Sequence, residues 1–183
     1  MTCTAVTVRP DGTDRGAAIR TVRSVPIVRA AVPSDWPAMA RIYAEGIATG
    51  NATFETEIPT WEAWDAAHLA EPRFVAEDTG ELVGWIAVSP VSSRPVYRGV
   101  VEHSVYVADT ARGRGVGRML VAALVEDAPR HGIWTIQTSV FAENEATVAL
   151  HESAGFRLVG RRERIAELGG EWRDTLLLEL RLP

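Results

Sequence analysis

The stretch from Ser104 to Leu120, SVYVADTARGRGVGRML, predicts a strand, a glycine-rich turn and the start of an amphipathic helix. Gly113, Gly115 and Gly117 allow the backbone to approach a ligand without an intervening side chain. The first N–H groups of a helix have no partners within it and lie at the positive end of its dipole, so they suit phosphate oxygens. We therefore expect an anionic cofactor at this turn.

Two other glycine motifs do not fit the turn. A Walker loop requires Gly-Lys-Ser/Thr, which GRGVGRM lacks, and the dinucleotide fingerprint G-x-G-x-x-G needs a different glycine spacing. What remains is a pyrophosphate cradle flanked by Arg112, Arg114 and Arg118. Arginine side chains near phosphates add charge-assisted hydrogen bonds to those of the backbone.

Composition and charge exclude several classes of protein. The 183 residues suit one domain, and 19 basic against 24 acidic residues give a net charge of −5, which argues against a nucleic-acid surface. Cys3 is the only cysteine, and the histidines are dispersed without metal-ligand spacing, so we expect neither a disulfide nor a metal site. No apolar run approaches a membrane span. We expect a cytoplasmic protein with a small-molecule partner.

The order of the predicted elements indicates an α/β (α+β) fold with a central mixed, mostly antiparallel sheet flanked by helices. Residues 1–24 show no periodicity and predict a mobile N-terminal extension, whereas 25–183 predict a single domain. Only the strand, helix and strand around the glycine turn require a parallel pair. The predicted strands are 27–31, 73–78, 81–90, 99–108, 133–140, 157–169 and 171–180. One helix is predicted after Ser34, a second after Thr60, a third from the glycine turn to about Asp127, and a fourth over 146–153.

Motifs in this order resemble the GNAT superfamily of acetyl-CoA-dependent N-acetyltransferases. ARGRGVGRML after SVYVA looks like its motif A, and NEATVALHESAGF is similar to its motif B. TFETE, EHSVYV, LHESAGF and EWRDTLLLEL together resemble the phosphinothricin and methionine sulfoximine (or sulfone) acetyltransferase branch. The resemblance covers about 27–182. It implies the GNAT acyl-CoA N-acyltransferase fold, acetyl transfer from acetyl-CoA to the α-amino group of a small amino acid or analogue, a detoxification role and a homodimer.

The resemblance also implies which residues bind acetyl-CoA. Backbone amides of the glycine turn would bind the pyrophosphate, strand residues would lie along the pantetheine arm, and Asn144 would either bind that arm or only cap its helix. The residues carried over are Arg112, Gly113, Arg114, Gly115, Val116, Gly117 and Arg118 in the turn, and Val105, Tyr106 and Val107 in the strand.

Glu102 is the first candidate for the catalytic base, because an amine enters as an ammonium ion and must lose a proton. The resembled branch assigns the base role to this glutamate, directly or through water; a glutamate paired with an arginine is the alternative. His103 alternates to the opposite strand face, so one of the two is structural or the strand is bulged. The resembled branch also has a histidine at the position of His151, which either protonates or hydrogen-bonds the departing thiolate, or is merely packed.

For the acceptor, the resemblance favours Arg94 and Arg98 as partners of a carboxylate or phosphinate, although exposed loop arginines are often only solvated. Phe54 and Tyr97 are expected to close over an apolar part of the substrate, with Glu55 nearby. His103 is a secondary candidate here. The loop VSSRPVYR is shorter and less basic than in the strict phosphinothricin enzymes, which leaves the acceptor's identity open.

Two other functions stay open. In the first, the acceptor of the acetyl group is a protein N-terminus, such as that of a ribosomal protein. In the second, the domain binds acyl-CoA without turnover. For an enzyme, the sequence favours direct attack of the amine on the thioester, because it has no G-x-S-x-G nucleophile elbow and Cys3 is the only thiol. The identity of the amino acid acceptor is not decided by these motifs.

Overall fold

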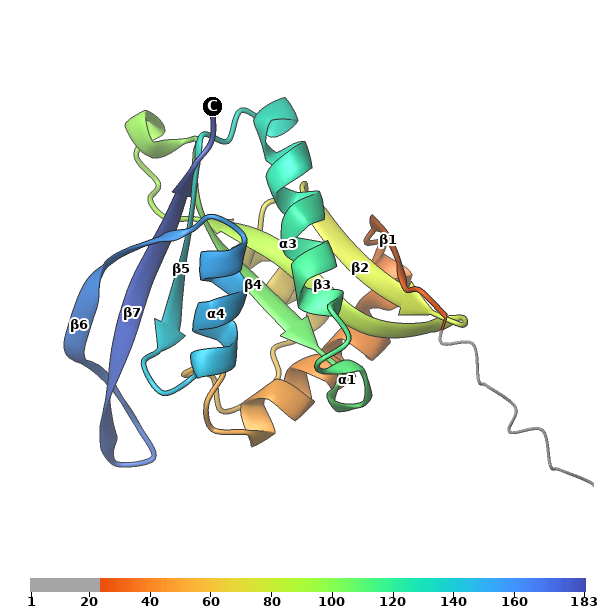
Figure 1. Ribbon diagram of the computed structural model, residues 1–183, viewed down its shortest axis with the longest axis horizontal. Coiled ribbons are helices and arrows are strands. Elements are labelled where there is room, and N and C mark those ends of the chain that lie inside the picture. The colour runs from red at the N-terminus through yellow and green to blue at the C-terminus, as the bar shows by residue number, and fades with distance from the viewer. Residues whose placement is uncertain (1–23) are drawn as a thin grey trace, which may run out of the picture.

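A computed structural model describes residues 24–183, which form one seven-stranded sheet with four α-helices in the described part of the chain (Figure 1). The strand order is β1-β2-β3-β4-β5-β7-β6. The predicted extension, 1–24, lies outside the described residues except for Ser24. The elements are β1 Ile27–Ala30, α1 Trp36–Ala48, α2 Trp61–Ala67, β2 Arg73–Asp78, β3 Glu81–Pro90, β4 Val100–Val107, α3 Val116–Asp127, β5 Thr135–Phe141, α4 Glu145–Ser153, β6 Arg157–Leu168 and β7 Glu171–Arg181.

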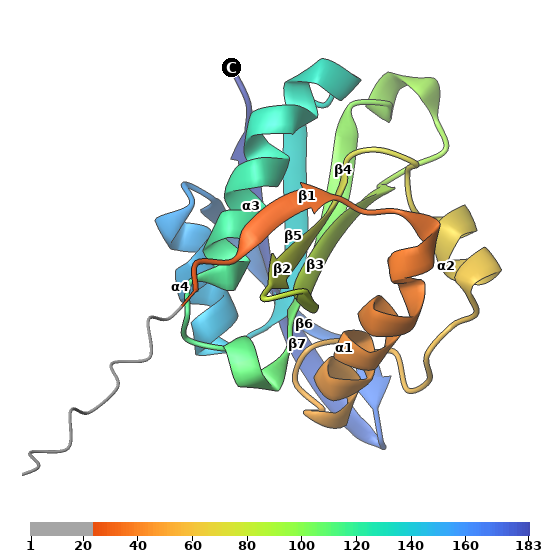
Figure 2. The same ribbon diagram turned by 90° about the vertical axis from the view of Figure 1, so that its right-hand side faces the viewer.

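The helices cover both faces of the sheet. Figure 2 shows α1 and α2 on one face and α3 and α4 on the other. Each face has its own apolar core because each helix presents an apolar stripe to the strands. Ile42 of α1 and Trp64 of α2 pack against Trp85, whereas Leu120 and Leu124 of α3 pack in the opposite core. The predicted mixed α/β sheet is confirmed.

The local turns follow from the sequence. Thr79 and Gly80 connect β2 to β3 with positive φ angles of 51° and 86°, as a two-residue hairpin loop requires. The closing hairpin of β6 and β7 turns at Gly169 and Gly170, also at positive φ. The only parallel pair in the described sheet is β4 with β5, the two strands that flank α3.

The strands β4 and β5 separate partway along the sheet. They pair only from Val100 to Glu102 with Thr135 to Gln137. Beyond that point β4 stays paired with β3 as far as Val107, and β5 stays paired with β7 as far as Phe141. The middle of the sheet therefore opens into a gap, which positions the candidate site.

The apolar run TLLLEL lies inside the sheet, in β7 between β5 and β6. Leu178 is fully buried and Thr175 nearly so, so this segment contributes to the core rather than to an exposed surface. None of the helices within residues 24–183 has the length and apolar character needed to cross a membrane.

Candidate functional site

Two hollows meet at the gap between β4 and β5. We call them the inner cavity, of about 390 Å³, and the outer cleft, of about 780 Å³. Both are lined by Val105 and Tyr106 of β4 and by Asn144 and Thr147 at the start of α4. A ligand in the outer cleft can therefore reach a second ligand in the inner cavity across the gap.

The glycine-rich turn forms one end of the outer cleft. Gly115 is the N-cap of α3 with φ 82°, and Gly113 has φ 71°. A Cβ at either position would meet no protein atom within 4 Å, so the backbone there faces open space. Arg112 and Arg118 also line the cleft. With the unpaired first amides of α3, this arrangement fits a pyrophosphate group.

Arg114 is placed differently from its two neighbours. Its Nη2 forms an ion pair at 2.6 Å with Oδ2 of Asp78, the last residue of β2. Asp78 is 8% exposed, and Arg114 is not among the residues that line the cleft. The structure therefore does not bring the Arg114 side chain to the cradle, since that side chain is held by Asp78.

The backbone of β4 presents hydrogen-bond donors to the gap. The Ala108 N–H donates to Val83 O on β3, while the His103 carbonyl accepts from Thr138 Oγ1 on the β5 side. Backbone groups alternate sides along a strand, so the N–H groups of Val105 and Val107 point away from β3 and into the gap. These are the two amides that the resemblance implied for the pantetheine arm.

Asn144 caps α4, which is one of the two roles predicted for it. Its Oδ1 accepts from the Thr147 N–H at 3.1 Å, and its Nδ2 donates to Asn51 O at 2.9 Å. The side chain therefore joins α4 to the loop after α1, and it lines both hollows while doing so.

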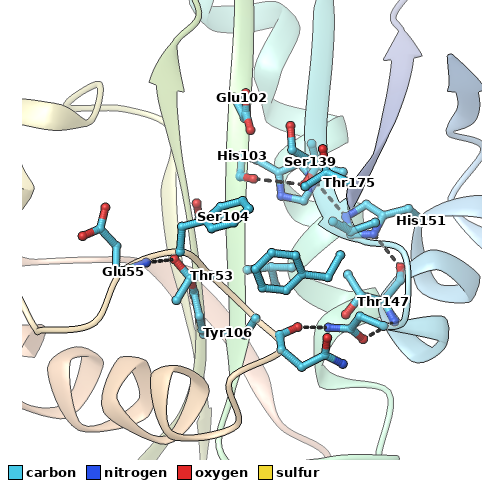
Figure 3. A pocket seen from close by; sticks show the side chains of 18 of the residues that line it. Thr53, Glu55, Glu102, His103, Ser104, Tyr106, Ser139, Thr147, His151 and Thr175 are labelled. Carbon is cyan, nitrogen blue, oxygen red and sulfur yellow. Dashed lines mark hydrogen bonds between the residues drawn. The ribbon is translucent and has the colours of Figure 1, made fainter. Parts of the chain in front are cut away.

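Glu102 lies on the wall of the inner cavity, at the last paired position before the gap (Figure 3). Gln137 Nε2 donates to its Oε2 at 2.9 Å, which orients the carboxylate. Glu55 also lines this cavity and is exposed. Phe54 is half-buried and makes an edge-to-face contact with Phe141, with 4.7 Å between the ring centroids. The loop after α1 thus closes one side of the cavity.

His103 also borders the inner cavity, although it faces the opposite side of the sheet from Glu102. β4 pairs with β3 without a register shift, so it is not bulged here, and His103 is 2% exposed with its ring against His151, which favours the structural role for His103 among the alternatives that the sequence left open. Because β5 departs after Gln137, the edge of β4 beyond Glu102 is unpaired in the described sheet, and residues on both faces of β4 border one cavity. Strand alternation alone does not decide which side chains share it.

His103 and His151 form a buried pair beneath this cavity (Figure 3). Their Nε2 atoms lie 2.9 Å apart, and His151 Nδ1 lies 2.7 Å from Thr147 O. Since that carbonyl can only accept, His151 Nδ1 is the donor and its Nε2 accepts from His103. Burial lowers the pKa of His151, and lowers the pKa of His103 well below its ordinary value. Neutral His151 therefore has no free N–H to donate.

Arg94, Tyr97 and Arg98 are not brought to either hollow. They lie in and beside a short 3₁₀ turn, Pro95–Tyr97, before the first residue of β4, whereas the inner cavity lies beside its middle. Arg94 stacks over Tyr97 at 5.7 Å, and Arg98 over Trp134 at 5.3 Å. All three of the predicted residues are exposed.

Several residues that line the inner cavity were not predicted from the sequence. Ser139 of β5, Arg162 and Ile165 of β6 and Thr175 of β7 all border the inner cavity. Ser139, Arg162 and Thr175 are polar residues within predicted strands, which was their only signal in the sequence, and the apolar Ile165 carried none. That signal is weak because such residues are ordinary in solvent-facing strands.

The geometry suits a reaction between two ligands. The outer cleft offers donors for a long anionic cofactor, the gap offers amides for an extended arm, and the inner cavity offers the Glu102 carboxylate. Chemistry that transfers a group from the cofactor to a small acceptor fits this layout.

Comparison with known proteins agrees with this geometry. A curated L-methionine sulfoximine/L-methionine sulfone acetyltransferase of Pseudomonas paraeruginosa is 30% identical over 85% of this chain and 94% of its own. A phosphinothricin N-acetyltransferase of Alcaligenes faecalis is 33% identical over 93% and 89%. The protein yncA of Salmonella typhimurium, solved with its cofactor acetyl-CoA, superposes with a TM-score of 0.80 at 28% identity, covering 86% and 94%. The acetyltransferase (GNAT) family model matches residues 36–156, so the chain belongs to that family.

Proposed function

We propose that this acetyltransferase moves the acetyl group of acetyl-CoA to the α-amino group of a small amino acid or analogue of the methionine sulfoximine or phosphinothricin type. The names of the relatives support this acceptor class. The observation that carries the proposal is the Glu102 carboxylate in a cavity of about 390 Å³ that opens onto the cofactor cleft. That volume is in the range of small-molecule sites.

The residues that line the outer cleft fit acetyl-CoA. The amides that begin α3, with Arg112 and Arg118, would hold its pyrophosphate, and the N–H groups of Val105 and Val107 would bind its extended arm. When bound, it supplies an activated acetyl group as a thioester. A strand amide aimed at the gap would also polarise the acetyl carbonyl.

Glu102 would act as the base that takes a proton from the acceptor's ammonium group, directly or through one water. The freed nitrogen would form a bond to the acetyl carbon while the bond from that carbon to sulfur breaks, and the second proton that the nitrogen loses would pass to the leaving sulfur. Gln137 would keep the carboxylate oriented towards the cavity. Direct attack is favoured because no cysteine lines either hollow and Cys3 lies outside the described residues.

The geometry favours a supporting role for His151 over proton donation to sulfur. Both of its ring nitrogens already make hydrogen bonds inside the protein, and its side chain is fully buried. With His103, it would form the floor that holds α4 against the gap.

A turnover screen tests the proposed function. The enzyme is supplied with acetyl-CoA and, in turn, methionine sulfone, methionine sulfoximine, phosphinothricin, the common amino acids and short peptides with free N-termini. Faster turnover with amino acid analogues than with peptides supports the proposal. Preference for peptides would favour a protein acceptor, and acetyl-CoA binding without any turnover would favour a binding module.

We also propose that the protein is a homodimer, as the family branch suggests. β6 forms one edge of the sheet (Figure 1) and carries the exposed side chains of Leu158 and Val159. An unpaired, partly apolar edge strand favours pairing with another chain. Sedimentation equilibrium at micromolar concentration tests this, since a monomer mass would contradict it.

A further inference from the structure

A bulge in β6 directly after Arg162 brings Ile165 to the same cavity as Arg162. Arg162 pairs with Thr175, and Ala166 pairs with Arg173, so residues 163–165 of β6 lie opposite Asp174 alone. Arg164 sits within the bulge at φ 49°, and its N–H donates to Asp174 Oδ1. Bulges redirect side chains next to functional sites. Here the bulge lets both Arg162 and Ile165 line one cavity, although an odd spacing separates them.

The Arg162 guanidinium is held by two hydroxyl groups. Its Nη2 donates to Ser139 Oγ at 2.5 Å, and its Nε donates to Thr175 Oγ1 at 3.2 Å. Thr175 is 2% exposed, so this anchor is fixed within the sheet. A guanidinium has five N–H donors, which leaves three of them, including both on Nη1, for another partner.

Among the described residues, Arg162 lacks the acidic partner that two other arginines of β6 have. Arg157 is paired with Glu179, and Arg161 with Asp174. For Arg162, no carboxylate lies within ion-pair distance anywhere in residues 24–183. A half-buried cation that is oriented by neutral groups and borders a cavity is suited to an anionic ligand.

The position of Arg162 relative to Glu102 matches an amino acid. Glu102 contacts Gln137, and Arg162 contacts Ser139, two residues further along β5 on the same face. Two residues of strand span about 6.6 Å. A carboxylate at one end of this span and a guanidinium at the other complement the ammonium and carboxylate groups of one α-amino acid.

We propose that Arg162 is the specificity residue that binds the α-carboxylate of the acceptor and thereby turns its amino group towards Glu102. The inference rests on the proposed function. Its N–H fork would bind the two carboxylate oxygens side by side, which a lysine cannot reproduce. This role replaces the one that the sequence suggested for the loop arginines, which lie outside the cavity.

Arg162→Gln, Arg162→Lys and the control Arg164→Gln test the inference. Arg164 is on the same strand, but its guanidinium lies over Trp172, 5.1 Å from the ring centre, and does not line the cavity. Each variant is assayed with methionine sulfone and with its α-carboxamide, which keeps the amine but lacks the carboxylate. Acetyl-CoA KM and melting temperature are measured in parallel.

We expect Arg162→Gln to raise the KM for methionine sulfone by about 10- to 100-fold, the effect of losing a charge-assisted hydrogen bond, while the KM for the carboxamide stays unchanged. The KM of Arg162→Lys for methionine sulfone should lie between those of the parent enzyme and Arg162→Gln, and the KM of Arg164→Gln should match that of the parent enzyme. An equal rise in the KM for both acceptors, or no rise for either, would overturn this inference and leave the proposed function standing. A parent enzyme that acetylates no amino acid would overturn the proposed function and the inference together.

Discussion

His103 and His151 share a hydrogen bond between their Nε2 atoms, 2.9 Å apart, in the interior of the protein. Burial lowers the pKa of both residues, so the folded protein keeps the pair neutral. The bond links β4, which borders the cofactor gap, to α4, which covers it. The pair therefore couples the geometry of the site to the stability of the fold.

This pair predicts a loss of stability in acid. Unfolded histidine takes up a proton near pH 6.5, whereas the buried pair resists it, so below that pH the unfolded state binds more protons. The free energy of unfolding should then fall as the pH falls, by up to about 1.4 kcal/mol per pH unit for each histidine.

Denaturant unfolding between pH 7.5 and 5 measures this slope. His103→Gln and His151→Gln should each flatten it, and the double variant should flatten it further. His68, whose pKa burial also lowers, would supply the slope that remains. Identical slopes in the parent and the double variant would rule out the pair as the cause.

The glycine turn predicts a separation of stability from cofactor binding. Gly115→Ala and Gly132→Ala both place a Cβ at positive φ, 82° and 69°, with no protein atom nearby. Each should lower the free energy of unfolding by about 1–2 kcal/mol. Only Gly115→Ala should also raise the KM for acetyl-CoA, because only Gly115 lines the outer cleft. Equal KM values in the two variants would refute the cradle assignment.

The arginines around the turn should differ in function. Arg118 lines the cleft, so Arg118→Gln should raise the KM for acetyl-CoA about tenfold or more. Arg114 is paired with Asp78, so Arg114→Gln should lower the melting temperature and leave that KM unchanged. Steady-state kinetics and thermal unfolding of both variants check this. A raised KM in Arg114→Gln would place its side chain at the phosphates.

Much of the fold is predictable from the sequence because local signals decide it. The pair Thr79 and Gly80 marks a hairpin, and the glycines before α3 mark a strand-to-helix turn with open amides. Hydrophobic periodicity places the helices and strands around these turns. The order of elements then requires one parallel pair, which is β4 with β5.

The candidate site is less predictable because it depends on how strands diverge. Glu102 and His103 alternate in sequence, yet they border one cavity because β5 leaves β4 after Gln137. Ile165 joins Arg162 at that cavity because of a bulge, and a bulge depends on pairing with β7 that no short stretch of β6 encodes. Equally, spacing alone does not show which arginine near the glycine turn pairs with Asp78.

The central claim is that Glu102 removes the proton from the acceptor amine. Glu102→Gln keeps the size of the side chain and leaves the outer cleft untouched, so acetyl-CoA affinity should be unchanged. Turnover should fall by about 10² to 10⁴-fold, most severely near and below neutral pH, where more of the amine is protonated. Glu57→Gln, an exposed glutamate of the loop after α1 that lines neither hollow, is the matched control.

The most direct measurement is the pH profile of kcat for Glu102→Gln and Glu57→Gln, taken with the best acceptor from the turnover screen and saturating acetyl-CoA. A large loss in Glu102→Gln that deepens towards acid, with a Glu57→Gln profile like that of the parent, is the predicted result. Parent-like turnover by Glu102→Gln at neutral pH would contradict the role of Glu102 as the base.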